Sequence, residues 1–162
     1  MIKDFRTGVG FDVHAFSSGR KLILGGVEIP FEKGLLGHSD ADVLLHALCD
    51  ALLGSLALGD IGRHFPDSDE KYKNIDSSEL LKSVYALVKQ KGYILNNLDA
   101  VLIIQKPKII SYIPKMKTRI GKILTLDEER ISIKATTTEE LGFIGRGEGI
   151  SALVNVLVIK EN

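Results

Sequence analysis

The chain has 162 residues, of which 44% are hydrophobic and 26% are charged, enough for one compact core. Lysine plus arginine and aspartate plus glutamate number 21 each, so no overall field attracts nucleic acid or an anionic membrane. The N-terminus lacks the segments of a secretion signal, and no window approaches the roughly 20 apolar residues of a membrane span. The single cysteine, Cys49, excludes an internal disulfide framework. We expect a single domain over residues 1–162 in the cytoplasm, with no nucleic-acid or membrane partner.

The N-terminal third of the chain predicts a short β unit followed by a helix. Residues 5–12 and 21–31 have strand character, and two consecutive glycines in the second segment can supply a hairpin turn. Apolar residues then recur at helical spacing, and Ser39 with Asp42 matches a capping box, so the first helix should begin near residue 40.

A polar segment follows from residue 59 to residue 74. It is rich in glycine, proline and aspartate and has no sustained apolar period, which predicts a long loop. Because loops of this length in compact domains are commonly functional, it is a candidate lid over a ligand. A second amphipathic helix begins near Asp76 and should end at Gly92, a residue suited to a C-terminal cap.

The C-terminal half predicts strands at 97–105, 130–137 and 150–159, with a third helix ending near Leu124. The last strand is apolar on both alternating faces, whereas a sheet with one wet face should alternate. The helices suffice for one face only, so the other face should pack against further subunits. We therefore expect a small mixed α/β sheet covered by helices on one face, in an oligomer.

Three residues form a candidate metal site. Asp12 and His14 stand two apart on a predicted strand, so both side chains leave the same face. His46 lies among leucines on the helix surface that should face the sheet. One carboxylate and two imidazoles with an open fourth position make a catalytic type of zinc set. The alternative is a hydrogen-bonded core histidine beside a turn-forming aspartate, and the neighbouring Cys49 is interpreted as ordinary packing.

Polar residues around the first helix could support this site. Asp42 and Asp50 lie four residues either side of His46, so either could orient its ring, although attraction to the helix N-terminus is sufficient for Asp42. His38 and Ser39 lie at the same helix start, where N–H groups and a hydroxyl can hold a phosphate. Capping alone would explain Ser39 but not His38.

A second polar cluster follows the strand at 130–137. The segment KATTTEELGFIGRGEG places hydroxyls, carboxylates, an arginine and four glycines within sixteen residues, a density that indicates an anion or metal site. It has neither the order of a Walker loop nor that of a dinucleotide-binding turn. A structural turn with a capped short helix is the alternative.

Five segments in order over nearly the whole chain resemble the 2-C-methyl-D-erythritol 2,4-cyclodiphosphate synthase family: RTGVGFDVHAF, LILGGVEIP, GLLGHSDADVLLHALCDALLGSLALGDIGRHFPD, QKPK and IKATTTEELGFIGRGEGISA. The resemblance implies an α/β sandwich of the chorismate mutase-like type that forms a homotrimer. It places active sites between neighbours, one supplying zinc ligands and the next the nucleotide pocket. It also implies a phosphorus–oxygen lyase of non-mevalonate isoprenoid biosynthesis, which converts 4-diphosphocytidyl-2-C-methyl-D-erythritol 2-phosphate to the cyclic 2,4-diphosphate and CMP.

The resemblance further implies roles for individual residues. Asp12, His14 and His46 would bind zinc. His38 and Thr137 would stabilise the transition state. Glu139 would bind a second metal, magnesium or manganese, and the phosphates would be bound by Ser39 and Thr136. The methylerythritol end would be bound by Asp60, Ile61, Gly62, Phe65, Pro66, Asp67, Ser68 and Asp69, and the cytidine by Ile104, Lys106, Pro107, Lys108, Ile109, Ile110 and Ala135. A central trimer cavity near Phe143 and Arg146 would bind an isoprenoid diphosphate.

Two other functions are to be separated by experiment. A zinc-dependent phosphohydrolase would use the open zinc position to activate water, and hydrolysis would leave no cyclic diphosphate. A non-catalytic trimeric ligand-binding protein would keep the metal as structure only. A structural zinc would not need His38, Thr137 and Glu139 beside it, which favours the synthase.

Overall fold

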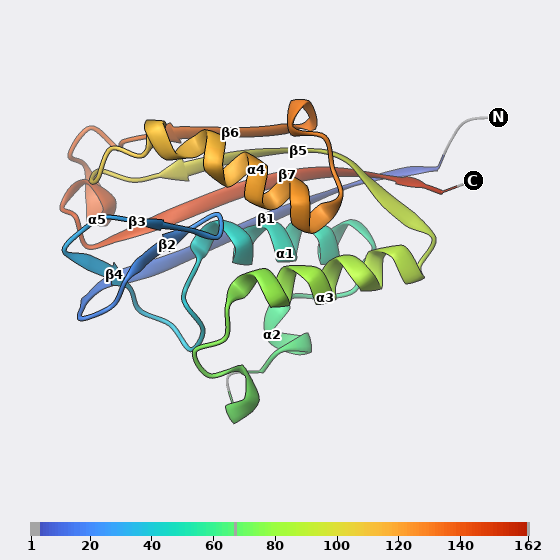
Figure 1. Ribbon diagram of the computed structural model, residues 1–162, viewed down its shortest axis with the longest axis horizontal. Helices are drawn as coiled ribbons and strands as arrows, with labels where there is room; N and C mark the ends of the chain where they lie inside the picture. Colours follow the sequence, from blue (N-terminus) through green and yellow to red (C-terminus); the bar gives the residue numbers. More distant parts are fainter. Residues whose placement is uncertain (1–3, 67, 162) are drawn as a thin grey trace.

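The computed structural model describes residues 4–66 and 68–161, in which helices pack on one face of a five-stranded sheet (Figure 1). The sheet strands are β1 (Phe5–Ser18), β4 (Lys33–Leu35), β5 (Tyr93–Ile103), β6 (Ile131–Thr136) and β7 (Gly149–Lys160), and a separate hairpin consists of β2 (Leu22–Leu24) and β3 (Val27–Ile29). The helices are α1 (Val43–Ser55), α2 (Ile61–His64), α3 (Ser77–Gln90), α4 (Ile113–Leu124) and α5 (Gly142–Gly145), with 3-10 turns η1 (Glu70–Tyr72), η2 (Ile110–Tyr112) and η3 (Glu128–Arg130).

The strand order is β4-β1-β7-β5-β6. β7 lies between β1 and β5 and is antiparallel to both, whereas β6 is parallel to β5 and is reached through α4. The predicted mixed α/β sheet with helices on one face is therefore confirmed. Among the helices described, none combines the length and apolar character that a membrane crossing requires.

Several predicted boundaries were wrong. The first strand runs on to Ser18, because β4 pairs with its C-terminal part, and β5 begins four residues earlier than predicted. The 59–74 segment contains two short helical turns, α2 and η1, which are too brief to give an apolar period. The Gly25-Gly26 turn, the end of α3 before Gly92 and the end of α4 at Leu124 are confirmed.

The predicted capping box at Ser39 was also wrong. Ala41 has a left-handed φ of 58°, so the helix cannot start before it. The N-cap is Asp42, whose carboxylate accepts hydrogen bonds from the backbone N–H groups of Leu44 and Leu45. The same carboxylate accepts N–H groups of the β2–β3 turn, so it ties the start of α1 to the hairpin.

Two glycines bring α1 directly onto β1. A Cβ atom at Gly8 would lie 1.9 Å from the Ala51 carbonyl oxygen, and one at Gly10 would lie 1.9 Å from that of Ala47. Side chains alternate along a strand, so Gly8 and Gly10 share their face with Asp12 and His14. The close approach of the two backbones therefore sets the height of α1 above this row of residues.

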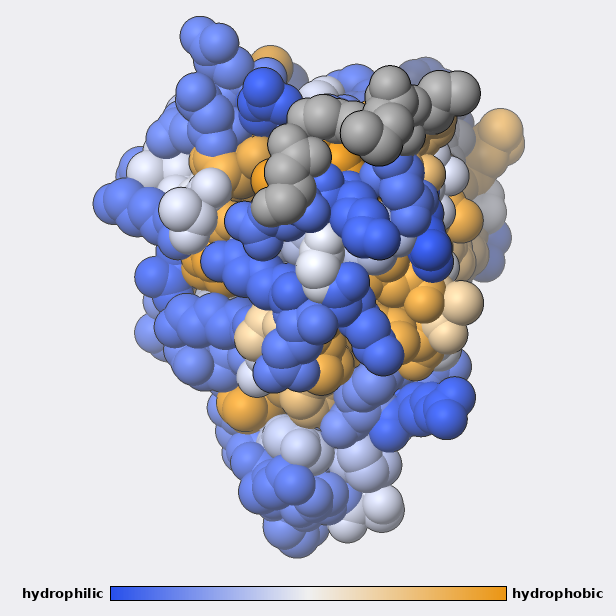
Figure 2. All heavy atoms as spheres, turned by 90° about the vertical axis from the view of Figure 1, so that its right-hand side faces the viewer, coloured by the Kyte–Doolittle hydropathy of each residue, from blue (hydrophilic) through white to orange (hydrophobic). Residues whose placement is uncertain are grey.

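The opposite face of the sheet carries exposed hydrophobic side chains. Val9 is 63% exposed and Phe11 is 58% exposed, with Phe5, Val13 and Leu153 also exposed. In the described part of the chain, no helix packs on this face, whereas the alternate β7 residues from Ile150 to Val158 are buried. At the end of the molecule near the chain termini, hydrophobic surface appears between hydrophilic residues (Figure 2).

The segment with α2 and η1 projects from the helix layer beyond α1 and α3 (Figure 1). Its tip is mainly hydrophilic, as the lower end of Figure 2 shows. On its inner side the rings of Phe65 and Tyr72 meet edge to face with centroids 5.3 Å apart. The aromatic pair thus joins the two ends of the segment, and both rings pack against the hydrophobic core.

Candidate active site

Asp12, His14 and His46 meet between β1 and α1, as the spacing predicted. His14 Nε2 and His46 Nδ1 are 3.0 Å apart, and Asp12 Oδ2 lies 3.0 Å from the first and 3.2 Å from the second. Within residues 4–66 and 68–161, these three form a group that could hold a metal ion. All three are half-buried, so the group faces a cavity rather than bulk solvent.

The donor atoms fit a tetrahedral metal. Zinc bonds of about 2.0–2.1 Å give tetrahedral edges of roughly 3.3 Å, close to the separations of the three donors. One carboxylate and two imidazoles supply three ligands and leave a fourth position for water or substrate. The interpretation of His46 as a core histidine is therefore less apt, because its Nδ1 points at two other potential ligands.

Electrostatics favour the ionised carboxylate. Burial opposes the charge of Asp12, but hydrogen bonds from His14 and His46 outweigh it and hold the pKa of Asp12 well below its usual range. Burial likewise opposes protonation of His14, but the hydrogen bond and charge of Asp12 raise the pKa of His14. Metal ligands have to be deprotonated, so a cation bound here would displace the protons that these groups hold.

The ring of His46 is held by hydroxyl groups. Its Nε2 lies 2.9 Å from Ser77 Oγ and 3.0 Å from Ser39 Oγ, and Ser77 Oγ lies 2.5 Å from an oxygen of Asp40. Sequence reasoning missed Ser77 and Asp40. Ser77 is 31 positions away and looked like an ordinary helix start, so spacing gave no signal for it.

The two aspartates predicted as possible partners of His46 have other roles. Asp42 caps α1, as its position allowed. Asp50 accepts a hydrogen bond from the backbone N–H of Ile61 at 2.7 Å and so anchors α2. Among the hydrogen bonds of the described residues, neither carboxylate contacts the His46 ring. Cys49 is buried, and burial raises the pKa of its thiol, as ordinary packing requires.

A cavity of about 240 Å³ opens over the three donor atoms. His38 lines it, and the Nε2 atom of His38 is buried without a hydrogen-bond partner among the described residues, which leaves it available to a ligand. Of the predicted substrate-binding residues, the cavity is lined by Ser39, Ile61, Gly62 and Phe65.

Four other predicted lid residues are described by the structure but do not line this cavity. Asp60 caps α2 through the Arg63 N–H, and Asp69 caps η1 and pairs with Lys71 at 2.8 Å. Pro66 and Ser68 are exposed. Asp67 lies outside the described residues. The roles of all these positions stay predictions, and of the described ones, Asp60, Pro66, Ser68 and Asp69 do not line the cavity.

A second cavity of about 390 Å³ lies at the ends of β5 and β6. Its walls include Gln105, which sequence reasoning missed, whereas the exposed Lys106 is not among them. It is lined by the predicted catalytic Thr137 and by predicted cytidine- and phosphate-binding residues: Ile104, Pro107, Lys108, Ile109, Ile110, Ala135 and Thr136. The two cavities have no lining residue in common.

Glu139 is exposed beside the second cavity. Its φ of 53° is left-handed, a conformation uncommon outside glycine, and its carboxylate accepts a hydrogen bond from Thr137 Oγ1 at 3.3 Å. Phe143 and Arg146 line neither cavity. Arg146 pairs with Glu148 at 2.7 Å, and Phe143 is 42% exposed.

A mixed sheet backed by helices, with an open Asp–His–His group, defines an α/β protein with a group of side chains that could hold a metal ion. Residues 5–159 match the YgbB family, and the chain belongs to that family. The 2-C-methyl-D-erythritol 2,4-cyclodiphosphate synthase of Carboxydothermus hydrogenoformans is 62% identical over 156 residues, which are 96% of this chain and 95% of that protein. The synthase of Bacillus subtilis is 58% identical over 96% of this chain and 99% of its own.

Solved structures agree with the family. A CDP complex of IspF from Plasmodium falciparum has a TM-score of 0.87 at 34% identity, with 100% of both chains covered. The bifunctional IspDF from Campylobacter jejuni has a TM-score of 0.95 at 48% identity. That match covers 99% of this chain, which spans only 43% of the bifunctional protein.

Proposed function

We propose that this chain is a phosphorus–oxygen lyase that converts 4-diphosphocytidyl-2-C-methyl-D-erythritol 2-phosphate to 2-C-methyl-D-erythritol 2,4-cyclodiphosphate and CMP. The observation that carries the proposal is the Asp12–His14–His46 donor set beside His38, whose Nε2 has no hydrogen-bond partner in the part of the chain that the structure describes. Membership of the family and the names of the relatives support the substrate and the product.

In this reaction an oxygen of the 2-phosphate forms a bond to the β-phosphorus. The bond from that phosphorus to the oxygen bridging to the α-phosphate breaks, and CMP leaves with the electron pair. Both groups belong to one molecule, so the protein has to fold the substrate into an in-line geometry and neutralise its phosphates. It needs no nucleophile of its own, and the inert Cys49 offers none.

The chain's residues divide this work. Asp12, His14 and His46 would hold zinc, and Glu139 would hold magnesium or manganese. When bound, these ions would polarise the reacting phosphate and neutralise charge on the leaving CMP. His38 and Thr137 would donate hydrogen bonds where charge develops. Ser39 and Thr136 would hold phosphate oxygens.

The two cavities would then belong to one site. In a homotrimer, the metal cavity of one subunit would face the nucleotide cavity of its neighbour, which agrees with the separation of the two cavities within one chain. The exposed Val9 and Phe11 face would be buried between subunits, and a central cavity near Phe143 and Arg146 would be open to an isoprenoid diphosphate. The proposal includes one catalytic domain over residues 1–162 and a cytoplasmic location, with which the free thiol of Cys49 agrees.

A reaction in water enriched in heavy oxygen tests the proposal against hydrolysis. Cyclisation takes its attacking oxygen from the substrate, so mass spectrometry should find a cyclic diphosphate and CMP without solvent oxygen. A hydrolase would place solvent oxygen in one product and leave linear phosphates. No conversion with zinc and magnesium present would contradict the catalytic assignment.

A further inference from the structure

We propose that Asp40 and Ser77 are positioning residues of the metal centre. Together they hold His46 in the tautomer that carries its proton on Nε2, so that Nδ1 keeps its lone pair for the metal. The inference rests on the proposed function, since it concerns the same metal site. It adds two residues that neither the sequence patterns nor the family resemblance singled out.

The three groups form a chain from the protein surface to the metal site. Asp40 lies in the loop before α1, and Ser77 is the first residue of α3 and is fully buried. Ser77 Oγ is 2.5 Å from Asp40 Oδ1 and 2.9 Å from His46 Nε2. Every link is therefore within hydrogen-bond distance.

Asp40 determines the direction of these hydrogen bonds. Its Oδ1 accepts the backbone N–H of Asp42 and its Oδ2 accepts that of Ser77, both at 3.1 Å. Both oxygens thus act as acceptors, and the Ser77 hydroxyl has to donate its one proton to Asp40. A lone pair of Ser77 Oγ then faces His46, and only a protonated Nε2 can complete that contact.

Ser39 alone would leave the tautomer undecided. Its Oγ lies 3.0 Å from His46 Nε2 and accepts the N–H of Ala41, but a hydroxyl can donate to a ring nitrogen or accept from it. The Asp40–Ser77 pair removes this ambiguity. His14 is fixed in a parallel way, because its Nδ1 lies 2.8 Å from the Leu36 carbonyl oxygen, which can only accept.

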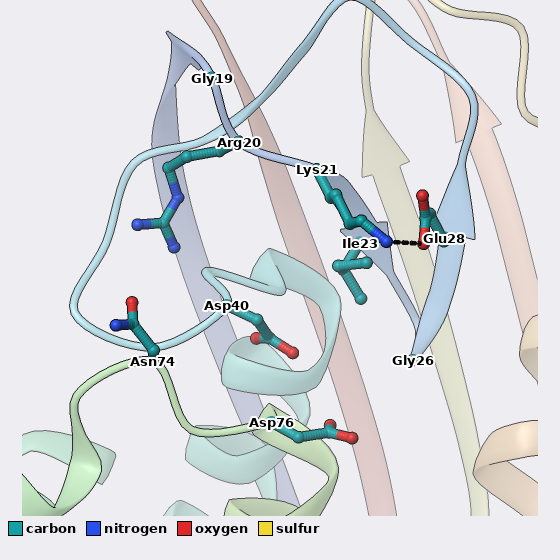
Figure 3. A pocket seen from close by; sticks show the side chains of 9 residues that line it. All are labelled: Gly19, Arg20, Lys21, Ile23, Gly26, Glu28, Asp40, Asn74 and Asp76. Carbon is teal, nitrogen blue, oxygen red and sulfur yellow. Dashed lines mark hydrogen bonds and ion pairs between the residues drawn. The ribbon is translucent and has the colours of Figure 1, made fainter.

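The outer end of the chain reaches the surface. Asp40 lines a cavity of about 660 Å³ together with Arg20, Asn74 and Asp76, shown in Figure 3. The guanidinium of Arg20 donates to the backbone carbonyl of Ser39 at 2.5 Å, which steadies the loop that carries both Ser39 and Asp40. Asp40 is thus half-buried and lines this cavity, while the buried Ser77 connects its carboxylate to the ring of His46.

The test compares two neighbouring serines. Ser77→Ala removes the hydrogen-bonding link to His46. Ser78→Ala removes an equally buried hydroxyl of the same helix turn, which accepts a hydrogen bond from Arg119 instead. Groups that orient a metal-binding histidine are typically worth 10–100-fold in metal affinity. We expect Ser77→Ala to raise the zinc Kd by about 10–100-fold and Ser78→Ala to leave it unchanged. Ser77→Thr, which keeps the hydroxyl, should recover affinity.

Nitrogen NMR of the zinc-free protein gives a measurement independent of zinc. At about pH 8, Asp12, 3.2 Å from Nδ1, favours a proton on Nδ1 of His46, whereas the Asp40–Ser77 pair favours one on Nε2, so Ser77→Ala and Asp40→Asn should shift the proton toward Nδ1 relative to wild type. Equal zinc affinity and equal tautomer populations in Ser77→Ala and wild type would overturn the inference. Failure of the wild type to bind zinc would instead contradict the proposed metal site, and the tautomer would still decide the positioning role.

Discussion

Adding one methyl group at Gly10 should push α1 away from β1. The new Cβ would lie 1.9 Å from the Ala47 carbonyl oxygen, whereas real Cβ contacts essentially never fall below 3.0 Å. The helix must therefore retreat by about 1 Å, since both atoms belong to rigid backbone. His46 precedes Ala47, so its Nδ1 should withdraw from Asp12 and His14.

We expect Gly10→Ala to lower the free energy of unfolding by about 3 kcal/mol, at the upper end for overpacking. Turnover should fall roughly 100-fold, because misplacement by 1 Å can cost that much. Gly54→Ala is the matched control: it lies in α1, its Cβ would meet nothing nearer than 3.8 Å, and it should stabilise by up to about 1 kcal/mol. Denaturant unfolding at one protein concentration measures the stability, a zinc titration measures the metal affinity, and a CMP-release assay measures the turnover. Wild-type stability and zinc affinity in Gly10→Ala would refute the reasoning.

Four further predictions concern the metal ligands and Glu139. His46→Ala should lose zinc and turnover, whereas Glu139→Ala should keep zinc and lose turnover; metal analysis beside a CMP-release assay checks the split, and wild-type rates in either variant would refute its role. If sites form between subunits, an equimolar reassembled mixture of these two inactive variants should regain roughly one quarter of wild-type activity. Half of the subunits keep His46 and half keep Glu139, so about one site in four would combine the two intact residues. No recovery would argue against shared sites. Zinc affinity should fall as pH drops through the raised pKa of His14, because the proton competes for Nε2, while Asp12 stays ionised over that range; a titration above and below pH 6.5 that shows no change would contradict this. In the metal-free protein the sign reverses, since the His14 contribution to stability is complete below 6.5 and is lost as pH rises through the folded pKa.

The metal ligands were predictable because their signals are local. Asp12 and His14 are two apart on a strand, and a period of two places them on one face whatever the rest of the fold does. His46 required only that the apolar face of α1 be turned to the sheet. The strands of the C-terminal half were equally clear, because β-branched runs bounded by polar residues identify them.

The support of His46 could not be predicted from such patterns. Ser77 reaches the ring only because the segment after α1 returns to place the start of α3 beside it, a contact over 31 positions. The αL conformation of Ala41 moved the helix cap from Ser39 to Asp42 and freed the Ser39 hydroxyl for the ring. Both outcomes depend on tertiary packing, which overrides the local capping signal.

Phosphorus NMR of the purified protein with the cytidyl substrate, zinc and magnesium tests the central proposal most directly. The account predicts CMP and a cyclic diphosphate, lost when the metals are removed by chelation and restored when they are returned. Linear phosphates formed in a metal-dependent way, or substrate that stays unchanged with both metals present, would contradict it.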